Sequence, residues 1–196
     1  MKKAIIISVL LLCSKFVAMS QNVDEKLSSI QGKWALDDRK NVTIQRIIEA
    51  PSLNKEEIYN RALNFFAYYY IDENIKIVNL DKSHGLVVAR GVFDNLNNSC
   101  RGWHVIKIDV KDGKAKILVT LTEYQYPKNI STDGVFNTWA HSKVSDEVPI
   151  NAKGSKYVYW GNAFYSFFTK ATSLVDSFEI AVKEGNTSNE IESSAW

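Results

Sequence analysis

The side chains best suited to covalent or metal chemistry are few in this sequence and poorly spaced. Cys100 and His104 are the nearest Cys/His pair, but on one strand their backbones would stand about 13 Å apart, too far for a nucleophile and its base. His84 follows Asp81 in a predicted turn and His141 lies far along the chain, so the three histidines do not reach zinc-ligand spacing. We predict no catalytic residue, no metal site and no cofactor, and we expect Cys100 to be an unpaired surface thiol.

Sequence motifs of known enzyme classes are also missing. The chain has no Gly-rich phosphate loop, no Gly-x-Ser-x-Gly elbow and no His-Glu-x-x-His. A hydrolase is an alternative if the segment 127–156 folds into a site around His141. Tyr126, Asp133 and Asp146 are the side chains that could converge on it. A hydrogen bond from His141 to an acid inside a pocket would be the sign of such a site.

Recognition is the chemistry that the sequence favours. Residues alternate between an apolar face and a mixed face along the strands expected at 103–111 and 115–126. The candidate binding residues of the mixed face are Arg90, Trp103, Lys107 and Tyr124, with Arg90 included if its own strand has the matching phase. If helices cover only the apolar face, these side chains form a surface for a protein, peptide or glycan partner. The alternative is that the segment 127–156 covers the mixed face.

A helix that can support these strands is predicted from Asn54 onward. Asn54 can cap it, and Glu57 stands three residues on, as in a capping box. The apolar side chains at helical spacing are Ile58, Ala62, Phe65, Phe66 and Tyr69. Tyr68 falls off this stripe, so the aromatic residues of "NFFAYYY" point in several directions. They predict a helix packed in the core and not a ligand cage.

The remaining elements complete one domain. Strands rich in β-branched residues are predicted at 41–50, 75–81, 86–94, 103–111 and 115–126. Asp112-Gly113 predicts a hairpin turn between the last two, and a second helix follows with apolar residues from Trp160 to Val182. The order β-α-β-β-β-β-α predicts a single α+β domain over residues 41–185, with a five-stranded antiparallel sheet and two helices on one face.

Residues 53–91 resemble a known family, the secreted Bacteroidota proteins grouped as domain of unknown function 4468. The family's lysine, Tyr-Asn-Arg-Ala and aromatic pair are similar to Lys55, Tyr59, Asn60, Arg61, Ala62, Phe65 and Phe66. Its Asp-Lys-x-x-Gly turn and following glycine are similar to Asp81, Lys82, Gly85 and Gly91. Phe65 stands where the family commonly has tryptophan. The resemblance covers about residues 42–185, implies a TBP-like fold with a curved sheet, and brings no catalytic residue.

A lipocalin-like small-molecule binder is an alternative fold. Gly32 and Trp34 form the Gly-x-Trp with which such barrels often open. That barrel needs eight successive antiparallel strands. In this chain a well-capped helix follows the first strand and a second long helix ends the domain, so the pattern favours the α+β domain.

The first twenty residues indicate the compartment of the protein. Residues 1–20 contain lysines, an apolar run and a small-x-small cleavage site, in the order of a secretory signal peptide. Their removal takes away Lys2, Lys3 and Lys15, which leaves 21 basic against 22 acidic residues. We expect an exported periplasmic or extracellular protein with its partner in the cell envelope, no nucleic-acid binding and no transmembrane span. Residues 21–40 are expected to be a loose segment and 186–196 a flexible tail.

Overall fold

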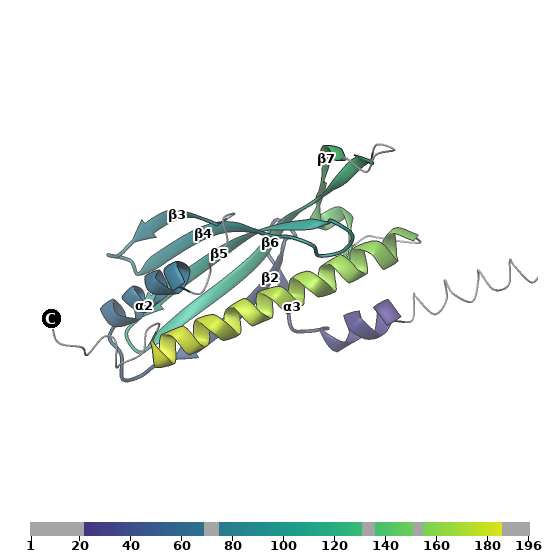
Figure 1. Ribbon diagram of the computed structural model, residues 1–196. Coiled ribbons are helices and arrows are strands. Elements are labelled where there is room, and N and C mark those ends of the chain that lie inside the picture. The colour runs from purple at the N-terminus through teal and green to yellow at the C-terminus, as the bar shows by residue number, and fades with distance from the viewer. Residues whose placement is uncertain (1–21, 69–74, 131–135, 151–154, 186–196) are drawn as a thin grey trace, which may run out of the picture.

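The helices and strands of the protein, seen in a computed structural model, form an antiparallel sheet with helices on one face (Figure 1). The structure describes residues 22–68, 75–130, 136–150 and 155–185. The strands are β1 (Ala35–Leu36), β2 (Val42–Glu49), β3 (Lys76–Asp81), β4 (Leu86–Phe93), β5 (Arg101–Lys111), β6 (Lys114–Ile130) and β7 (Phe136–Lys143). The helices are α2 (Lys55–Tyr68), the 3-10 helix η1 (Val144–Asp146), α3 (Ser155–Glu184) and a stretch at residues 22–29.

The sheet order is β1-β2-β6-β5-β4-β3, and β7 also pairs with β6. One edge of β6 pairs with β5. The other edge of β6 pairs with β2 along its first half and with β7 along its second half. The α+β prediction is confirmed, since β2 to β6 are the five predicted strands and α2 and α3 the two predicted helices. The sequence did not predict β1 or β7. The lipocalin-like alternative is wrong, because the described strands form an open sheet that ends at β1 and β3.

A bulge in β6 reverses the direction of the side chains beyond it. His104 of β5 pairs with Leu121, but the neighbouring pair joins Trp103 to Glu123, so Thr122 is an extra residue on β6. The hydroxyl of Thr122 donates to the carbonyl oxygen of Trp103 at 3.1 Å. An extra residue shifts the alternation by one position. Side chains of β6 after the bulge therefore point to the face opposite the one that simple alternation predicts.

The predicted stripe of α2 is buried against the sheet and α3. The N–H of Glu57 donates to Oδ1 of Asn54, and the N–H of Asn54 donates to Oε2 of Glu57, both at 3.0 Å, so the predicted capping box forms. Phe65 is buried and meets Phe178 of α3 edge to face, with ring centroids 5.3 Å apart. The aromatic stretch is core over its described part. The side chain of Tyr68 and residues 69–74 lie outside the described residues.

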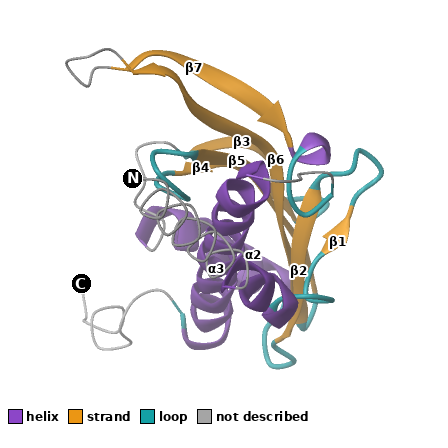
Figure 2. Ribbon diagram, turned by 90° about the vertical axis from the view of Figure 1, so that its right-hand side faces the viewer, coloured by secondary structure: helices purple, strands orange, loops and turns teal. Residues whose placement is uncertain are grey.

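α3 runs along the same face of the sheet as α2 (Figures 1 and 2). Its buried large side chains are Trp160, Phe164, Phe167, Phe168, Leu174, Val175, Phe178 and Val182. Nη1 of Arg61 on α2 donates to the carbonyl oxygens of Val182 at 2.7 Å and Lys183 at 3.1 Å. These carbonyls belong to the last turn of α3 and lack partners within the helix. Arg61 therefore ties the two helices together.

The N-terminal segment is packed where the sequence predicted a loose stretch. Residues 22–29 are helical, and Val23 and Ile30, seven residues apart on one side of this stretch, are buried. The hydroxyl of Tyr157 on α3 donates to Oδ1 of Asp24 at 2.6 Å. Val23 lies against Gly161 of α3 and the Tyr157–Asp24 hydrogen bond adds a polar contact, so the expectation of a loose stretch at 21–40 is wrong for its first part.

The predicted signal peptide and tail, residues 1–20 and 186–196, lie outside the described residues. Along the described part of the chain, no helix combines the length and the apolar character needed to cross a membrane.

Candidate binding face

The side of the sheet opposite the helices forms the candidate site. α2 and α3 lie together on one side of the sheet (Figure 2). We call the other side of β4 to β7 the open face. The strand registers place on it Arg90, Arg101, Trp103, Val105, Lys107, Glu123, Gln125, Trp139 and His141. These side chains are partly or largely exposed, whereas Gly102, His104 and Ile106, which alternate with them on β5, are buried on the helix side.

Arg90 and Trp103 form one cation–π pair of the open face. Arg90 pairs with Val105 across β4 and β5, which makes Trp103 its diagonal neighbour. The guanidinium carbon of Arg90 lies 4.7 Å from the centroid of the Trp103 ring. Nε1 of Trp103 donates to Oε1 of Gln125 at 3.2 Å, which orients the ring. Arg90 is exposed and has the phase that its inclusion among the candidate residues required.

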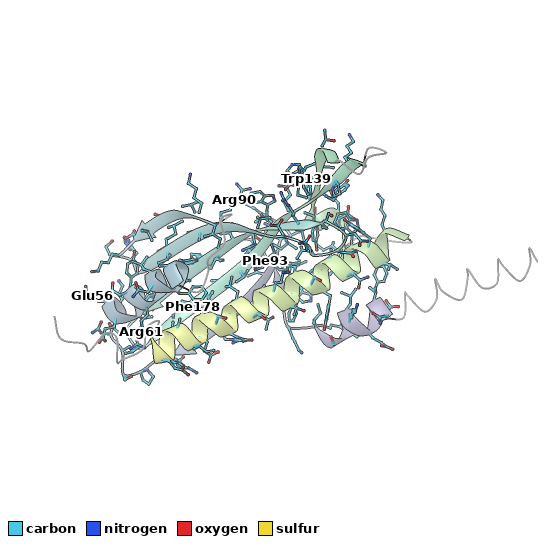
Figure 3. The ribbon with its side chains drawn as sticks, in the orientation of Figure 1. Glu56, Arg61, Arg90, Phe93, Trp139 and Phe178 are labelled. Carbon is cyan, nitrogen blue, oxygen red and sulfur yellow. The ribbon has the colours of Figure 1, made fainter. Side chains whose placement is uncertain are left out.

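Arg101 and Trp139 form a second pair farther along β5. The guanidinium carbon of Arg101 lies 4.3 Å from the centroid of the Trp139 ring, and its Nε lies 2.6 Å from Oδ1 of Asp94. In Figure 3, Trp139 and Arg90 lie toward the upper edge of the molecule, away from Phe178 and Arg61 beside the helices. Sequence reasoning missed Trp139 because it missed β7. The stretch "FNTWAHSK" gave no clear signal, because its apolar residues, Phe136, Trp139 and Ala140, do not alternate with polar ones.

Lys107 lies on the open face as predicted, nearer the middle of β5. It pairs with Val88 of β4, and its Nζ lies 3.0 Å from Oδ2 of Asp109 on the same strand. Both side chains are substantially exposed, so the pair contributes little to stability. Lys107 can therefore exchange this partner for a ligand at low cost.

Tyr124 is not on the open face, and its prediction as a binding residue there is wrong. Tyr124 pairs with Gly102, is fully buried, and packs on Trp160 of α3 with ring centroids 4.9 Å apart. Its hydroxyl donates to the carbonyl oxygen of Val148 at 3.4 Å, and burial raises its pKa well above the ordinary value. The bulge at Thr122 is the physical cause, because it turns Tyr124 toward the helices.

The residues proposed for a hydrolase do not converge. His141 is on the open face, where its Nδ1 lies 3.0 Å from Oε1 of Glu123. Tyr126 packs against Trp160 on the helix side, with ring centroids 5.5 Å apart. Asp146 is exposed and accepts a hydrogen bond from the neighbouring Ser145 hydroxyl. His141 thus has an acid partner in Glu123, but neither Tyr126 nor Asp146 contributes to that contact, and Asp133 lies outside the described residues.

The segment 127–156 does not cover the open face with its described residues. β7 pairs edge to edge with the second half of β6, so the two strands extend the sheet (Figure 1). Val144 and Val148 beyond β7 belong to the buried core on the helix side. The open face is therefore uncovered by the described part of this segment.

Cys100 and His104 are both buried on the helix side. Burial raises the pKa of the Cys100 thiol to about 12, against a hydrogen bond with Tyr159 that lowers it. The expectation of a surface thiol is wrong, and a thiol that stays protonated is a poor nucleophile. His104 stacks on Phe93 with ring centroids 4.0 Å apart. Cys100 and His104 are therefore both part of the core.

A turn between β3 and β4 has the composition of a catalytic triad without its geometry. Asp81 Oδ2 lies 2.7 Å and Ser83 Oγ 3.1 Å from the same nitrogen, Nδ1 of His84. Ser83 Oγ also donates to Oδ1 of Asp81 at 2.6 Å. A triad needs the serine and the acid on different ring nitrogens. These contacts stabilise a turn, and no group of three or more metal-binding side chains occurs among the described residues.

Residues that carry the family resemblance meet where α2 begins. Nζ of Lys55 donates to the carbonyl oxygen of Ser83 at 2.7 Å, and Nζ of Lys82 donates to Oε1 of Glu56 at 2.6 Å. Gly85 has φ +69°, and a Cβ there would lie 2.5 Å from the carbonyl oxygen of Val110 and 2.7 Å from Cε of Lys55. We call this contact between α2 and the β3–β4 turn the clamp. It positions the helix on the sheet and lies away from the open face.

Comparisons with known proteins agree with this architecture. Residues 45–126 match the family model described as a domain of unknown function (DUF4468) with TBP-like fold. A crystal structure of a TBP-like protein from Parabacteroides distasonis ATCC 8503 has a TM-score of 0.57 at 18% identity, covering 75% of this chain and 96% of that chain. A DUF4468 family protein from Bacteroides ovatus ATCC 8483 has a TM-score of 0.56 at 12% identity, with coverages of 81% and 95%. No curated protein matches the sequence. The resemblance to this family and the TBP-like fold are confirmed.

Proposed function

We propose that this chain, a DUF4468-type domain with a TBP-like fold, is an exported binding module that holds a protein, peptide or glycan on its open face without chemical turnover. The observation that carries the proposal is the pair of Arg–Trp stacks on a sheet surface that neither α2 nor α3 covers. Large aromatic and guanidinium groups are the side chains most enriched in binding hot spots.

The geometry of the stacks suits recognition. A guanidinium that lies over an indole ring keeps its in-plane N–H groups available for a carboxylate or a carbonyl oxygen. Trp103 is oriented by Gln125, and both stacks stand on paired strands, so little conformational freedom is lost when a partner binds. Glu123 and His141 between them add polar groups of both kinds.

Binding can be tested with the folded protein and two variants of the open face. Trp103→Ala and Trp139→Ala should each abolish capture of ligands that the wild type retains from peptide arrays, glycan arrays and the native envelope fraction. Ile47→Ala is the matched control, because Ile47 is an exposed large apolar residue on β2, away from both stacks. It should bind like the wild type.

Far-UV circular dichroism and thermal melting must show that each variant remains folded. Trp103 is partly buried, so we expect its removal to cost only about 1–2 kcal/mol of unfolding free energy. Ligand capture that survives in either folded tryptophan variant, or that is lost equally in Ile47→Ala, would refute the open face as the binding surface.

Export is a separate part of the proposal and has its own test. The order of charged, apolar and small residues in 1–20 supports cleavage after Ser20. Amino-terminal sequencing of the secreted protein should begin at Gln21. A secreted chain that begins at Met1, or that carries a lipid on Cys13, would contradict this.

A further inference from the structure

The outer strand of the sheet, β3, has an unusual surface. Among the described strands it pairs only with β4, so no described strand occupies its other edge. Ile77, Val78 and Leu80 are 38%, 54% and 51% exposed, and they make up three of the six exposed large hydrophobic residues of the described chain. Free edges in soluble proteins are normally protected by charges or proline along the strand. Here the middle of the edge strand is apolar.

The two ends of β3 carry opposite charges. Its sequence, "KIVNLD", begins with Lys76 and ends with Asp81. In an antiparallel pair of two such strands, Lys76 of each copy can stand opposite Asp81 of the other, and Ile77 opposite Leu80. Asp81 is held by Ser83 and by the N–H of His84, which keep its pKa well below the ordinary value, so it is charged near neutral pH. The strand is therefore complementary to itself.

A bulge in β3 makes this register possible. Residues an odd number of positions apart point to opposite faces in a regular strand, and paired residues must share a face. The register with β4 shifts between Ile77 and Asn79. As a result Ile77 and Leu80, which pair with the buried Ala89 and Val87, both face the helix side.

The charged ends satisfy the same condition on the other side of the sheet. Lys76 pairs with Arg90 and Asp81 pairs with Leu86, so both share the phase of Arg90 on β4. Because of the bulge, Ile77 and Leu80 share one face of the sheet, and Lys76 and Asp81 share the other. Without it, the apolar pair and the ionic pair would each be split across the sheet.

We propose that β3 pairs antiparallel with β3 of a second copy of this chain, about a two-fold axis between Val78 and Asn79. The pairing buries the exposed apolar side chains, satisfies the free backbone edge and places two Lys76–Asp81 ion pairs at its ends. The axis is perpendicular to the sheet, so the open faces of both copies lie on the same side. This inference concerns β3 and does not depend on the ligand proposed for the open face.

Analytical ultracentrifugation over a concentration series tests the assembly. The wild type should sediment as a dimer. Leu80→Lys would bury a lysine opposite Ile77 in the dimer, so it should sediment as a monomer, and circular dichroism should show that this monomer is folded. Ile47→Lys adds the same charge at an exposed apolar residue of β2 and should remain a dimer. A monomeric wild type at the highest soluble concentration, or a folded Leu80→Lys variant that still dimerises, would overturn the proposal.

Disulfide formation tests the register. Side chains directly opposite each other have Cβ atoms about 4.5–5.5 Å apart, within reach of a disulfide. A mixture of Ile77→Cys and Leu80→Cys proteins should therefore form a covalent heterodimer on mild oxidation, whereas each variant alone should not, because identical positions are offset by three residues. Cys100 is buried and does not interfere. Cross-linking of either variant alone, or a mixture that forms no heterodimer, would contradict the assigned axis.

Discussion

Replacing Phe65 by alanine tests how α2 is seated on the sheet. The Phe65 side chain is 1% exposed. Its ring meets Phe178 of α3 edge to face at 5.3 Å between centroids and Phe66 at 5.5 Å. Alanine would leave a cavity between α2, α3 and the sheet, which the packed helices can fill only in part.

The expected cost follows from the burial and from the ring contact. Truncation of a fully buried phenylalanine lowers the free energy of unfolding by about 3–5 kcal/mol. The edge-to-face contact with Phe178 should account for about 0.5–1.5 kcal/mol of this. A double-mutant cycle with Phe178→Ala isolates that share, because the two side chains touch and their separate costs should not add.

Urea denaturation at equilibrium measures these costs, and Asn64→Ala is the matched control. Asn64 precedes Phe65 on the same helix and is exposed, so its replacement should change the free energy of unfolding by less than about 0.5 kcal/mol. A cost below about 1 kcal/mol for Phe65→Ala, or a larger cost for Asn64→Ala, would show that the phase of α2 is wrong.

Three further predictions concern single residues. Gly85→Ala should destabilise the protein by about 1–3 kcal/mol more than Gly113→Ala in thermal or chemical denaturation, because both glycines have positive φ but only at Gly85 would a Cβ clash with the backbone. Cys100, whose pKa is about 12, should resist thiol reagents in the folded protein and react once denaturant unfolds it, as a thiol titration would show. Asp81→Asn should be less stable than the wild type near neutral pH. Because the folded-state pKa of Asp81 lies below its unfolded value, this difference should shrink as the pH falls below about 4, measured by denaturation across that range.

Elements defined by local sequence could be predicted. The start of α2 depends on Asn54 and Glu57, three residues apart, and both bonds of their capping box form. The buried stripe of α2 follows from helical periodicity, and β2 to β6 follow from alternation and turn residues. Trp103 and Lys107 were placed on one face because they stand an even number of residues apart on one strand, and Arg90 joined them on the condition, met in the structure, that its own strand has the matching phase.

Features that depend on pairing between distant segments could not be predicted. The bulge at Thr122 exists only in the register of β6 against β5, and it moved Tyr124 from the expected surface to the core. Trp139 contacts Arg101 because β7 pairs with the part of β6 that lies beyond the end of β2. Nothing near Trp139 in the sequence indicates Arg101 as its neighbour. The helical stretch at 22–29 is too short to be recognised without the surface of α3 on which it packs.

The clamp has a consequence for how such chains are recognised. Lys55, Lys82 and Gly85 hold α2 against the β3–β4 turn, and none of them lies on the open face. A search that recognises this signature therefore selects chains that share a scaffold, whatever they bind. Under the proposed function, specificity would depend on other side chains, those of the open face such as Arg90, Trp103 and Trp139, which take no part in the clamp. Two proteins with the same signature can differ in ligand, and grafting the open-face residues of one onto the other should transfer specificity while leaving the fold intact.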